Sequence, residues 1–294
     1  MRLSKLLVKE NFEIKKLTFF KIGGKIAKIY FPENIEEFMQ VLQNEPRAQV
    51  IGNLSNTLIS SDGYNGTVIS TSKLANVTVK NNIITAEAGV KGPKLSQIAE
   101  NNNLSGMEFM IGFPGSIGGE VYMNAGAHGQ EISDIFLSAK VYDGEKFITL
   151  NKSEMKFAYR KSVCQMKNYI VLDATFELKS DANISERMKE NLNFRQTHQP
   201  SLALPNCGSI FKNPENNSAG KLLDECKVKN LQYGGAKVWE NHANFIINFD
   251  DASSQDVLNL MIEMQKRVKE KFDIKLKPEI KYLGGESELW QMLQ

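Results

Sequence analysis

The sequence contains few of the residues that build disulfide scaffolds and metal sites. Its 294 residues include three cysteines and three histidines, with no Cys-x-x-Cys pair. An odd number of cysteines without paired spacing argues against both a disulfide framework and a zinc site. The histidines, His128, His198 and His242, do not have metal-ligand spacing. We therefore expect no bound metal.

Charge of one sign and long apolar runs are also missing. Lys and Arg number 36 and Asp and Glu 34, so the net charge of +2 is too small to favour nucleic acid or an anionic membrane. Residues 1–16 carry charges every few positions, unlike a signal peptide. The longest uncharged apolar stretch, 109–119, is too short and glycine-rich to cross a bilayer. We expect a cytoplasmic protein without membrane insertion.

Short strands alternate with helices along the chain, but without the regular rhythm of a doubly wound sheet. The length suggests about two domains, and we expect an α+β fold. Hydrophobic periodicity and turn residues predict strands at 26–31, 48–51, 67–71, 77–80, 83–88, 138–142, 146–150, 169–178 and 245–249. The same criteria predict helices after Asn34, from Gly92, over 185–195, near Ser218 and over 256–272, with the last twenty residues partly extended.

Glycine is concentrated in residues 111–129, where it occupies six of nineteen positions. Glycine weakens regular elements, so this density indicates backbone that approaches something closely or takes a positive φ. Turns of this kind hold phosphate-bearing cofactors through backbone N–H groups, and Ser116 and Asn124 add donors. Tight packing of turns is the alternative. No correctly placed Gly-x-Gly-x-x-Gly or P-loop motif is present.

Other segments carry polar residues that could act on a substrate, although each also has an ordinary structural interpretation. No Gly-x-Ser-x-Gly elbow is present, and no His/Asp couple pairs with a serine, which argues against a hydrolase triad. His242 is more typical of a structural histidine than of a catalyst. The remaining candidates are Ser55 and Asn56 in a turn, Tyr159 and Arg160, Ser209 with Lys212 and Asn213, Lys221 at a helix start, and Glu279 among apolar residues.

Taken in order, these segments resemble the UDP-N-acetylenolpyruvoylglucosamine reductase (MurB) family, in its shorter type II form. The resemblance runs nearly end to end, and its most specific parts are the glycine-rich stretch and GSIFKNP. The matching segments are TFFKIGG (18–24), IGNLSNTLI (51–59), GFPGSIGGEVYMNAGAHG (112–129), YRKS (159–162), CGSIFKNP (207–214), AGKLLD (219–224), HANFIIN (242–248) and LKPEIKYLG (276–284).

The resemblance implies a two-part FAD-binding unit of the vanillyl-alcohol-oxidase (PCMH) type, followed by a C-terminal α+β substrate-binding domain. FAD-binding subdomain 1 would span residues 1–75 and subdomain 2 residues 76–194. The substrate-binding domain would span 195–274. The C-terminal segment, 275–294, would return to the FAD-binding unit.

The implied activity is that of a UDP-N-acetylmuramate dehydrogenase, a flavoprotein of peptidoglycan synthesis and hence of cell-wall growth and division. NADPH would reduce bound FAD, and a hydride would then reduce the enolpyruvyl group of the UDP-sugar. Arg160 would bind the substrate carboxylate and stabilise the charge that develops beside it. A buried, protonated Glu279 could donate a hydrogen bond there, and Ser209 would deliver a proton to carbon.

The resemblance also implies a set of binding residues. Substrate contacts would come from Tyr159, Lys212, Asn213 and Lys221. Backbone and side chains around FAD would come from Gly52, Asn53, Leu54, Ser55, Asn56, Thr57, Pro114, Gly115, Ser116, Gly118, Gly119, Asn124, Ala125 and Gly126.

Two residues depart from the family pattern. Leu54 stands where a turn glycine is usual, and it would be strained if that position needs a positive φ. Trp239 stands where a small serine is usual, and it would narrow the substrate pocket or fill core. Two other functions stay open at this point. One is a reductase of the same fold with another substrate, and the other is a non-catalytic nucleotide- or FAD-binding protein, which only Leu54 favours.

Overall fold

The computed structural model describes residues 6–294 except 182 and 202. The chain forms two compact units, each assembled from separate segments. Unit 1 contains the N-terminal residues up to Lys9, Ile29–Asn53 and Thr67–Arg195, and unit 2 contains Glu10–Lys28, Leu54–Gly66 and Gln196–Gln294. The division into four segments that the resemblance implies stays a prediction.

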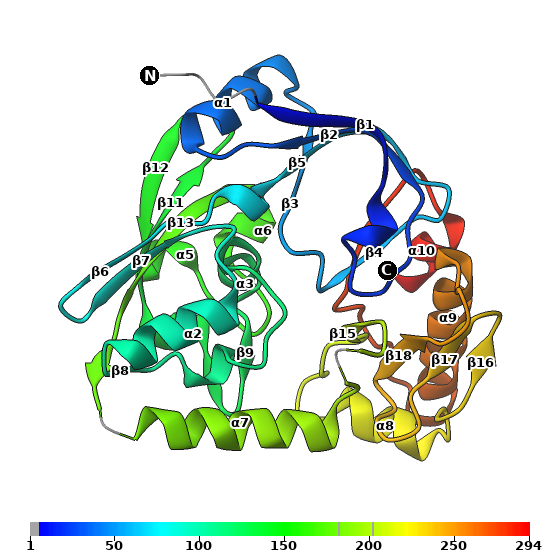
Figure 1. Cartoon of the computed structure of the whole chain (residues 1–294). Coiled ribbons are helices and arrows are strands. Elements are labelled where there is room, and N and C mark those ends of the chain that lie inside the picture. Colours follow the sequence, from blue (N-terminus) through cyan, green and yellow to red (C-terminus); the bar gives the residue numbers. More distant parts are fainter. Residues whose placement is uncertain (1–5, 182, 202) are drawn as a thin grey trace. The chain divides into compact units, whose positions relative to one another are not determined.

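A four-stranded sheet is built from early segments of the chain, in the order β1-β2-β5-β3 (Figure 1). Its strands are β1 (Leu7–Glu13), β2 (Lys25–Phe31), β5 (Tyr64–Ser70) and β3 (Gln49–Ile51). Helix α1 (Ile35–Asn44) begins at Asn34, whose side chain accepts a hydrogen bond from the backbone N–H of Glu37, as a helix-capping residue does. The apolar face of α1 packs on Ile69 and Leu74.

The central sheet of unit 1 has five antiparallel strands in the order β12-β11-β13-β7-β6. They are β12 (Phe147–Asn151), β11 (Phe136–Tyr142), β13 (Ile170–Glu177), β7 (Ile83–Glu87) and β6 (Val77–Lys80). The hairpin of β6 and β7 turns at Asn81, which has a φ of 54° and so confirms the predicted Asn-Asn turn. From Leu172 to Phe176, buried and half-buried residues of β13 alternate, as expected of a strand with one face on a core.

Two helices of unit 1 lie against this sheet (Figure 1). Helix α2 (Gly92–Asn101) starts with Gly92-Pro93, where proline suits the first turn because its missing N–H needs no partner. Helix α3 (Ile117–Met123) buries Ile117 and Val121 in the core beside α2 and β13. Helix α3 starts within the glycine-rich stretch, which positions the cofactor candidates described below.

The remaining elements of unit 1 are short. They comprise η2 (Thr71–Lys73), η3 (Glu108–Met110), α4 (Ile132–Ile135), α5 (Lys152–Met155), α6 (Val163–Lys167), and the small pairs β8 (Leu104–Ser105) with β14 (Lys179–Ser180) and β9 (Gly126–Ala127) with β10 (Gln130–Glu131).

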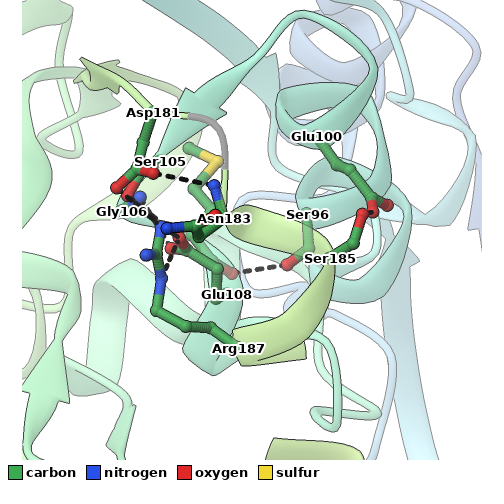
Figure 2. A network of polar contacts seen from close by, with 10 residues as sticks. Ser96, Glu100, Ser105, Gly106, Glu108, Asp181, Asn183, Ser185 and Arg187 are labelled. Atoms are coloured by element: carbon green, nitrogen blue, oxygen red, sulfur yellow. Dashed lines mark hydrogen bonds and ion pairs between the residues drawn. The ribbon is translucent and has the colours of Figure 1, made fainter. Parts of the chain in front are cut away.

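Helix α7 (Ile184–His198) is polar, and a network of charged side chains fixes its first turn to unit 1 (Figure 2). The guanidinium of Arg187 donates to Glu108 at 2.7 and 3.0 Å and to Asp181 at 3.0 Å. Glu108 is 3% exposed. Burial alone would raise the pKa of Glu108, but hydrogen bonds from Arg187, Gly106 and Ser105 outweigh it and hold that pKa below its usual value.

Replacing Arg187 with alanine should destabilise unit 1 by about 3 kcal/mol, because the buried Glu108 carboxylate would lose its only cationic partner among the described residues. Urea denaturation of the purified chain measures this loss. Lys266→Ala is the matched control, since Lys266 pairs with Glu270 at 3.8 Å on an exposed helix face and such pairs contribute little. Equal losses in the two variants would contradict the importance of the buried pair.

Unit 2 is organised around a four-stranded antiparallel sheet in the order β15-β18-β17-β16, packed against a long helix. The strands are β15 (Asn206–Ser209), β18 (Phe245–Asn248), β17 (Ala236–Val238) and β16 (Gln232–Tyr233). Helix α9 (Ser254–Phe272) starts with a reciprocal cap between Ser253 and Asp256 and buries the predicted stripe that includes Val257, Met261 and Met264. The other elements of unit 2 are η1 (Ile14–Lys16), β4 (Thr57–Ile59), α8 (Ala219–Glu225), β19 (Lys281–Leu283) and α10 (Glu288–Leu293).

Two features differ from the sequence-based expectation. The glycine-rich stretch contains helix α3, although glycine disfavours helix. Burial of Ile117 and Val121 outweighs that preference. Near the C-terminus, the expected extended structure is present as β19, which pairs in parallel with β4. The difference is α10, a helix that packs on α9. Its capping residue Ser287 accepts a hydrogen bond from the backbone N–H of Trp290, a local signal that the sequence contained.

Candidate active site

In unit 1 the loop that begins at Gly52 lies against the glycine-rich segment. The Asn53 side-chain amide donates to the Pro114 carbonyl. A Cβ atom placed on Gly52 would lie 2.7 Å from the Ser116 hydroxyl oxygen, so any larger residue there would displace that hydroxyl. The fold thus brings together two segments that sequence analysis assigned to the cofactor separately.

Most glycines of residues 111–129 are needed because neighbouring atoms approach their backbone closely, and not because they have unusual backbone angles. Only Gly129, among the six, has a positive φ. A Cβ atom placed on Gly118 would lie 2.8 Å from the Ala88 Cβ, and one on Gly126 would lie 2.5 Å from the Gln130 carbonyl oxygen. At these positions the close neighbour is protein, as the packing interpretation expects. A Cβ atom on Gly119 would have no neighbour closer than 4.0 Å, so Gly119 leaves open space.

The same region holds polar atoms that the described protein does not satisfy. The Ser116 hydroxyl and both carboxyl oxygens of Glu120 are buried, and none has a hydrogen-bond partner within the described residues. Buried polar groups in proteins are nearly always hydrogen-bonded. Because protein encloses these oxygens, they do not face a ligand, and it is the open space at Gly119 that fits the close approach of a polar cofactor such as FAD.

Leu54 has the backbone conformation that the family's glycine would favour. Its φ is 55°, and it is 5% exposed. A left-handed conformation costs a residue with a Cβ about 1–2 kcal/mol, while burial of a leucine side chain stabilises by about 1.5–3 kcal/mol. Leucine is tolerated here because its burial offsets the strain.

Leu54→Ala should therefore destabilise the protein more than Leu54→Gly does, by about 1 kcal/mol. Both variants lose the buried side chain, but only glycine relieves the left-handed backbone. Thermal denaturation of the two variants measures the difference. A glycine variant that is no more stable than the alanine variant would contradict the strain at this position.

Arg160 lies in a strained but well-supported turn of unit 1. Its φ is 52°, and the flanking residues Ala158 and Lys161 exchange two backbone hydrogen bonds of 3.0 Å. The Gln165 side chain donates to the Arg160 carbonyl at 3.1 Å. Strained residues held by several surrounding contacts are concentrated at functional sites. This geometry supports the functional interpretation of Arg160 over that of a plain surface charge.

The Arg160 side chain reaches the end of the glycine-rich segment. Its guanidinium donates to the Gly126 carbonyl at 2.9 Å and lies 5.1 Å from the centre of the Tyr159 ring, which is itself half exposed. Asn124 is fully buried and connects the segments, because its amide accepts from the Ser133 N–H and donates to the Ala158 carbonyl. Both ends of that amide have protein partners, which points to a positioning role for the Asn124 side chain.

Ser209 ends strand β15 of unit 2, opposite Phe245 of β18. The preceding Gly208 has a φ of 80°, and its N–H donates to the Asn206 side chain at 3.0 Å. Within the described part of the chain, the Ser209 hydroxyl makes no hydrogen bond, and the residue is half-buried. The turn therefore presents a hydroxyl that is not committed to the protein.

Glu279 is half-buried and lies beside Ile210, the residue after Ser209, although sixty-nine positions separate Glu279 from Ile210 in the sequence. The Glu279 N–H donates to the Ile210 carbonyl at 2.8 Å, and the Asn56 amide donates to the Glu279 carbonyl at 3.2 Å. Three segments of unit 2 that sequence analysis selected independently thus meet at Ile210 and Glu279.

Asn244 is a residue that sequence analysis missed. Its side chain is 3% exposed, accepts from the Phe211 N–H at 2.9 Å and donates to the Phe211 carbonyl at 2.8 Å. Its own carbonyl accepts from Ile210. Asn244 therefore fixes the backbone directly after Ser209. The only sequence signal for this role was that Asn244 lies in the HANFIIN segment.

His242 agrees with its interpretation as a structural histidine. Its Nδ1 accepts from the Asn244 N–H at 3.2 Å, and its ring packs edge-on against Phe245. Burial lowers the pKa of His242, so the neutral ring that can accept this bond is favoured. Trp239, which departs from the family pattern, directly follows β17 and is half-buried.

The predicted substrate residues of unit 2 have different surroundings. The Asn213 side chain accepts from the Ala219 N–H at 3.0 Å and so supports the start of α8. Lys221 is exposed on α8, and Lys212 is half-buried. Although Lys281 is exposed by surface area, partial loss of solvation lowers its pKa, and the nearby positive charge of Lys212 lowers it further. Two neighbouring lysines beside Glu279 fit an anionic substrate, and Lys281 was not singled out from the sequence.

The described residues hold neither a membrane-spanning helix nor a cluster of metal ligands. None of their helices is both long and apolar enough to span a bilayer. In the same part of the chain, no three or more His, Cys, Asp or Glu side chains come together as metal ligands would.

Comparison with known proteins places this geometry in a family. Residues 27–146 match the FAD binding domain family, and residues 199–283 match the C-terminal domain of UDP-N-acetylenolpyruvoylglucosamine reductase. The chain is 39% identical to that reductase from Caldicellulosiruptor saccharolyticus over 99% of both sequences, and 39% identical to reductase 2 from Bacillus cereus strain ATCC 14579 over 96% of this chain and 94% of the relative.

A solved structure agrees with these matches. The crystal structure of MurB from Thermus caldophilus superimposes with a TM-score of 0.80 at 32% identity, over 95% of this chain and 99% of that one. The FAD-binding domain and the domain that follows it together define an FAD-dependent oxidoreductase. The chain belongs to the UDP-N-acetylenolpyruvoylglucosamine reductase family, whose cofactors are FAD and NADPH. The family and the PCMH-type fold expected from the sequence are thereby confirmed.

Proposed function

We propose that this chain reduces the enolpyruvyl group of UDP-N-acetylglucosamine enolpyruvate to UDP-N-acetylmuramate for peptidoglycan synthesis. The observation that carries the proposal is the uncommitted Ser209 hydroxyl, on a turn that Asn244 fixes and whose next residue, Ile210, bonds to the Glu279 backbone. When bound, FAD supplies the electron chemistry by taking a hydride from NADPH and passing one to the substrate. The protein's part is to bind, orient and protonate.

Arg160 is proposed to bind the substrate carboxylate. A guanidinium presents planar, paired donors that match a carboxylate, and it keeps its charge at any physiological pH. Hydride addition to the enolpyruvyl double bond develops negative charge next to that carboxylate. A fixed positive charge there lowers the barrier. The supported turn around Arg160 keeps the guanidinium in place before the charge develops.

Ser209 is proposed to protonate the carbanion carbon. A serine hydroxyl is a weak acid, so its position must compensate for its low acidity. The left-handed Gly208 and the hydrogen bonds of Asn244 set that position. Glu279 is proposed to stabilise the enolate-like intermediate by a hydrogen bond.

The cofactor and substrate contacts named from the sequence complete the proposal. The loop at 52–57, the segment 114–119 and residues 124–126 would hold FAD. Tyr159, Lys212, Asn213 and Lys221 would contact the UDP-sugar. The three cysteines are free thiols, which fits the proposed setting in the reducing cytoplasm.

An anaerobic stopped-flow experiment on the purified protein tests the function. NADPH is added first, and the flavin absorbance should fall. UDP-N-acetylglucosamine enolpyruvate is added next, and the absorbance should return rapidly. A flavin that bleaches and stays reduced would mean that the substrate is another compound. A protein that carries no flavin would contradict the cofactor assignment itself.

A further inference from the structure

Ser162 and Gln165 have the spacing of a helix cap that the structure does not use. Ser162 directly precedes α6, and Gln165 stands three positions later, which is the Ser-x-x-Gln pattern of a capping box. In a capping box, the two side chains bond to each other's backbone N–H groups. Within the described chain, neither of those bonds is present at the start of α6. Both side chains therefore make their contacts outside their own helix.

These contacts lie at the end of α3, forty positions before Ser162. The Ser162 hydroxyl donates to the Tyr122 carbonyl at 2.7 Å, and the Gln165 amide donates to the same carbonyl at 2.8 Å. Ser162 is fully buried, and Gln165 is half-buried. Tyr122 lies in the last turn of α3, where carbonyl groups have no partner within the helix. The two bonds thus satisfy this carbonyl and connect α6 to α3.

Gln165 makes a second bond, and this bond leads to Arg160. The same amide nitrogen donates to the Arg160 carbonyl at 3.1 Å. Both partners of the amide are carbonyl oxygens, so they require a group with two N–H donors, which glutamine supplies and glutamate does not. Gln165 therefore joins the backbone of Arg160 directly to the Tyr122 carbonyl of α3.

Arg160 benefits from this connection because its backbone conformation is unfavourable. Its φ of 52° is in the left-handed region, which residues with a Cβ seldom adopt. Ala158 and Lys161 exchange two backbone hydrogen bonds, so Arg160 lies at the tip of a two-residue turn. Its guanidinium donates to the Gly126 carbonyl, just beyond α3. By orienting the Arg160 carbonyl, Gln165 also orients the backbone from which the guanidinium extends.

We propose that Gln165 is a positioning residue for reduction of the UDP-sugar, because it holds Arg160 against the end of α3. This inference rests on the proposed function, in which Arg160 binds the substrate carboxylate. Gln165 acts only through Arg160. A guanidinium that is already in place stabilises the developing charge without first having to move. Loss of the Gln165 bonds would let the left-handed turn relax and would displace the guanidinium.

The test is single-turnover reduction of UDP-N-acetylglucosamine enolpyruvate by the full-length protein, loaded with FAD and reduced by NADPH. Gln165→Met keeps the length of the side chain and removes both N–H donors. The rate constant of flavin reoxidation at saturating sugar should fall about tenfold, since a displaced catalytic group slows the reaction. Flavin reduction by NADPH should be unchanged. Should this variant fail to fold, Gln165→Ala is expected to give the same loss.

The rate constant separates positioning from folding, because a purely structural loss would lower the amplitude of reoxidation and leave the rate constant as in wild type. The Arg160→Ala background then shows whether Gln165 acts through Arg160. In that background Gln165→Met should cause no further loss, since residues that act as one unit have non-additive effects. Gln97→Met is the matched control, because it makes the same change at an exposed position of α2 and should keep the wild-type rate.

Two results would overturn the inference and leave the proposed function standing. One is a Gln165→Met protein with the wild-type rate constant, and the other is an equal loss from Gln165→Met with and without Arg160. If Arg160→Ala itself reduces the sugar at the wild-type rate, the proposed role of Arg160 fails, and the positioning role of Gln165 fails with it.

Discussion

Replacing Ser209 with alanine should slow reduction of the UDP-sugar about a thousandfold or more while leaving flavin reduction by NADPH nearly unchanged. The proposed proton transfer from Ser209 belongs only to the second half-reaction, and removing an interaction made only in that transition state affects that step alone. The effect should be large because no other group on the described turn replaces the hydroxyl, while Asn244 still holds the backbone.

The two half-reactions can be followed separately by stopped-flow absorbance of the flavin. NADPH reduction of the variant is the internal control for folding and FAD binding. Ser209→Cys is the conservative variant, since a thiol can also donate a proton, and it should recover part of the rate. Equal losses in both half-reactions of Ser209→Ala would exclude the proposed role.

Replacing Glu120 with glutamine should remove a pH-dependent loss of stability from the FAD-free protein. Burial raises the pKa of Glu120 from 4.5 to about 8, so between these values the folded state holds a proton that the unfolded state has released. Stability is therefore unaffected below this window, decreases as pH rises through it and levels off above it. The linked cost is roughly 3 kcal/mol between pH 5 and pH 8.

Urea denaturation at a series of pH values measures this effect as the difference between wild type and Glu120→Gln. The difference should grow by roughly 3 kcal/mol in favour of the variant from pH 5 to pH 8. Glu190→Gln is the control, because it makes the same chemical change at an exposed position of α7. A difference that stays constant with pH would show that Glu120 has a partner in the folded chain.

Local patterns in the sequence predicted much of the secondary structure. The apolar stripe of α9, the Asn81 turn between β6 and β7, and the caps of α1 and α8 depend on neighbours within a few residues. The glycine-rich stretch was identified as a close-approach segment for the same reason. Its helix was missed, because burial of Ile117 and Val121 is a tertiary contribution that local propensity does not contain.

The sequence alone determined the family, the FAD-dependent chemistry and the identities of the candidate residues, because each motif keeps its residue types and order along the chain. Tertiary structure alone decided which of them meet. Glu279 lies beside Ile210 through a backbone hydrogen bond, and Asn244 holds Phe211 from another strand. Tertiary structure also decided that Glu120 is buried without a hydrogen-bond partner among the described residues. Burial and long-range hydrogen bonds depend on residues far apart in sequence, so no local pattern can encode them.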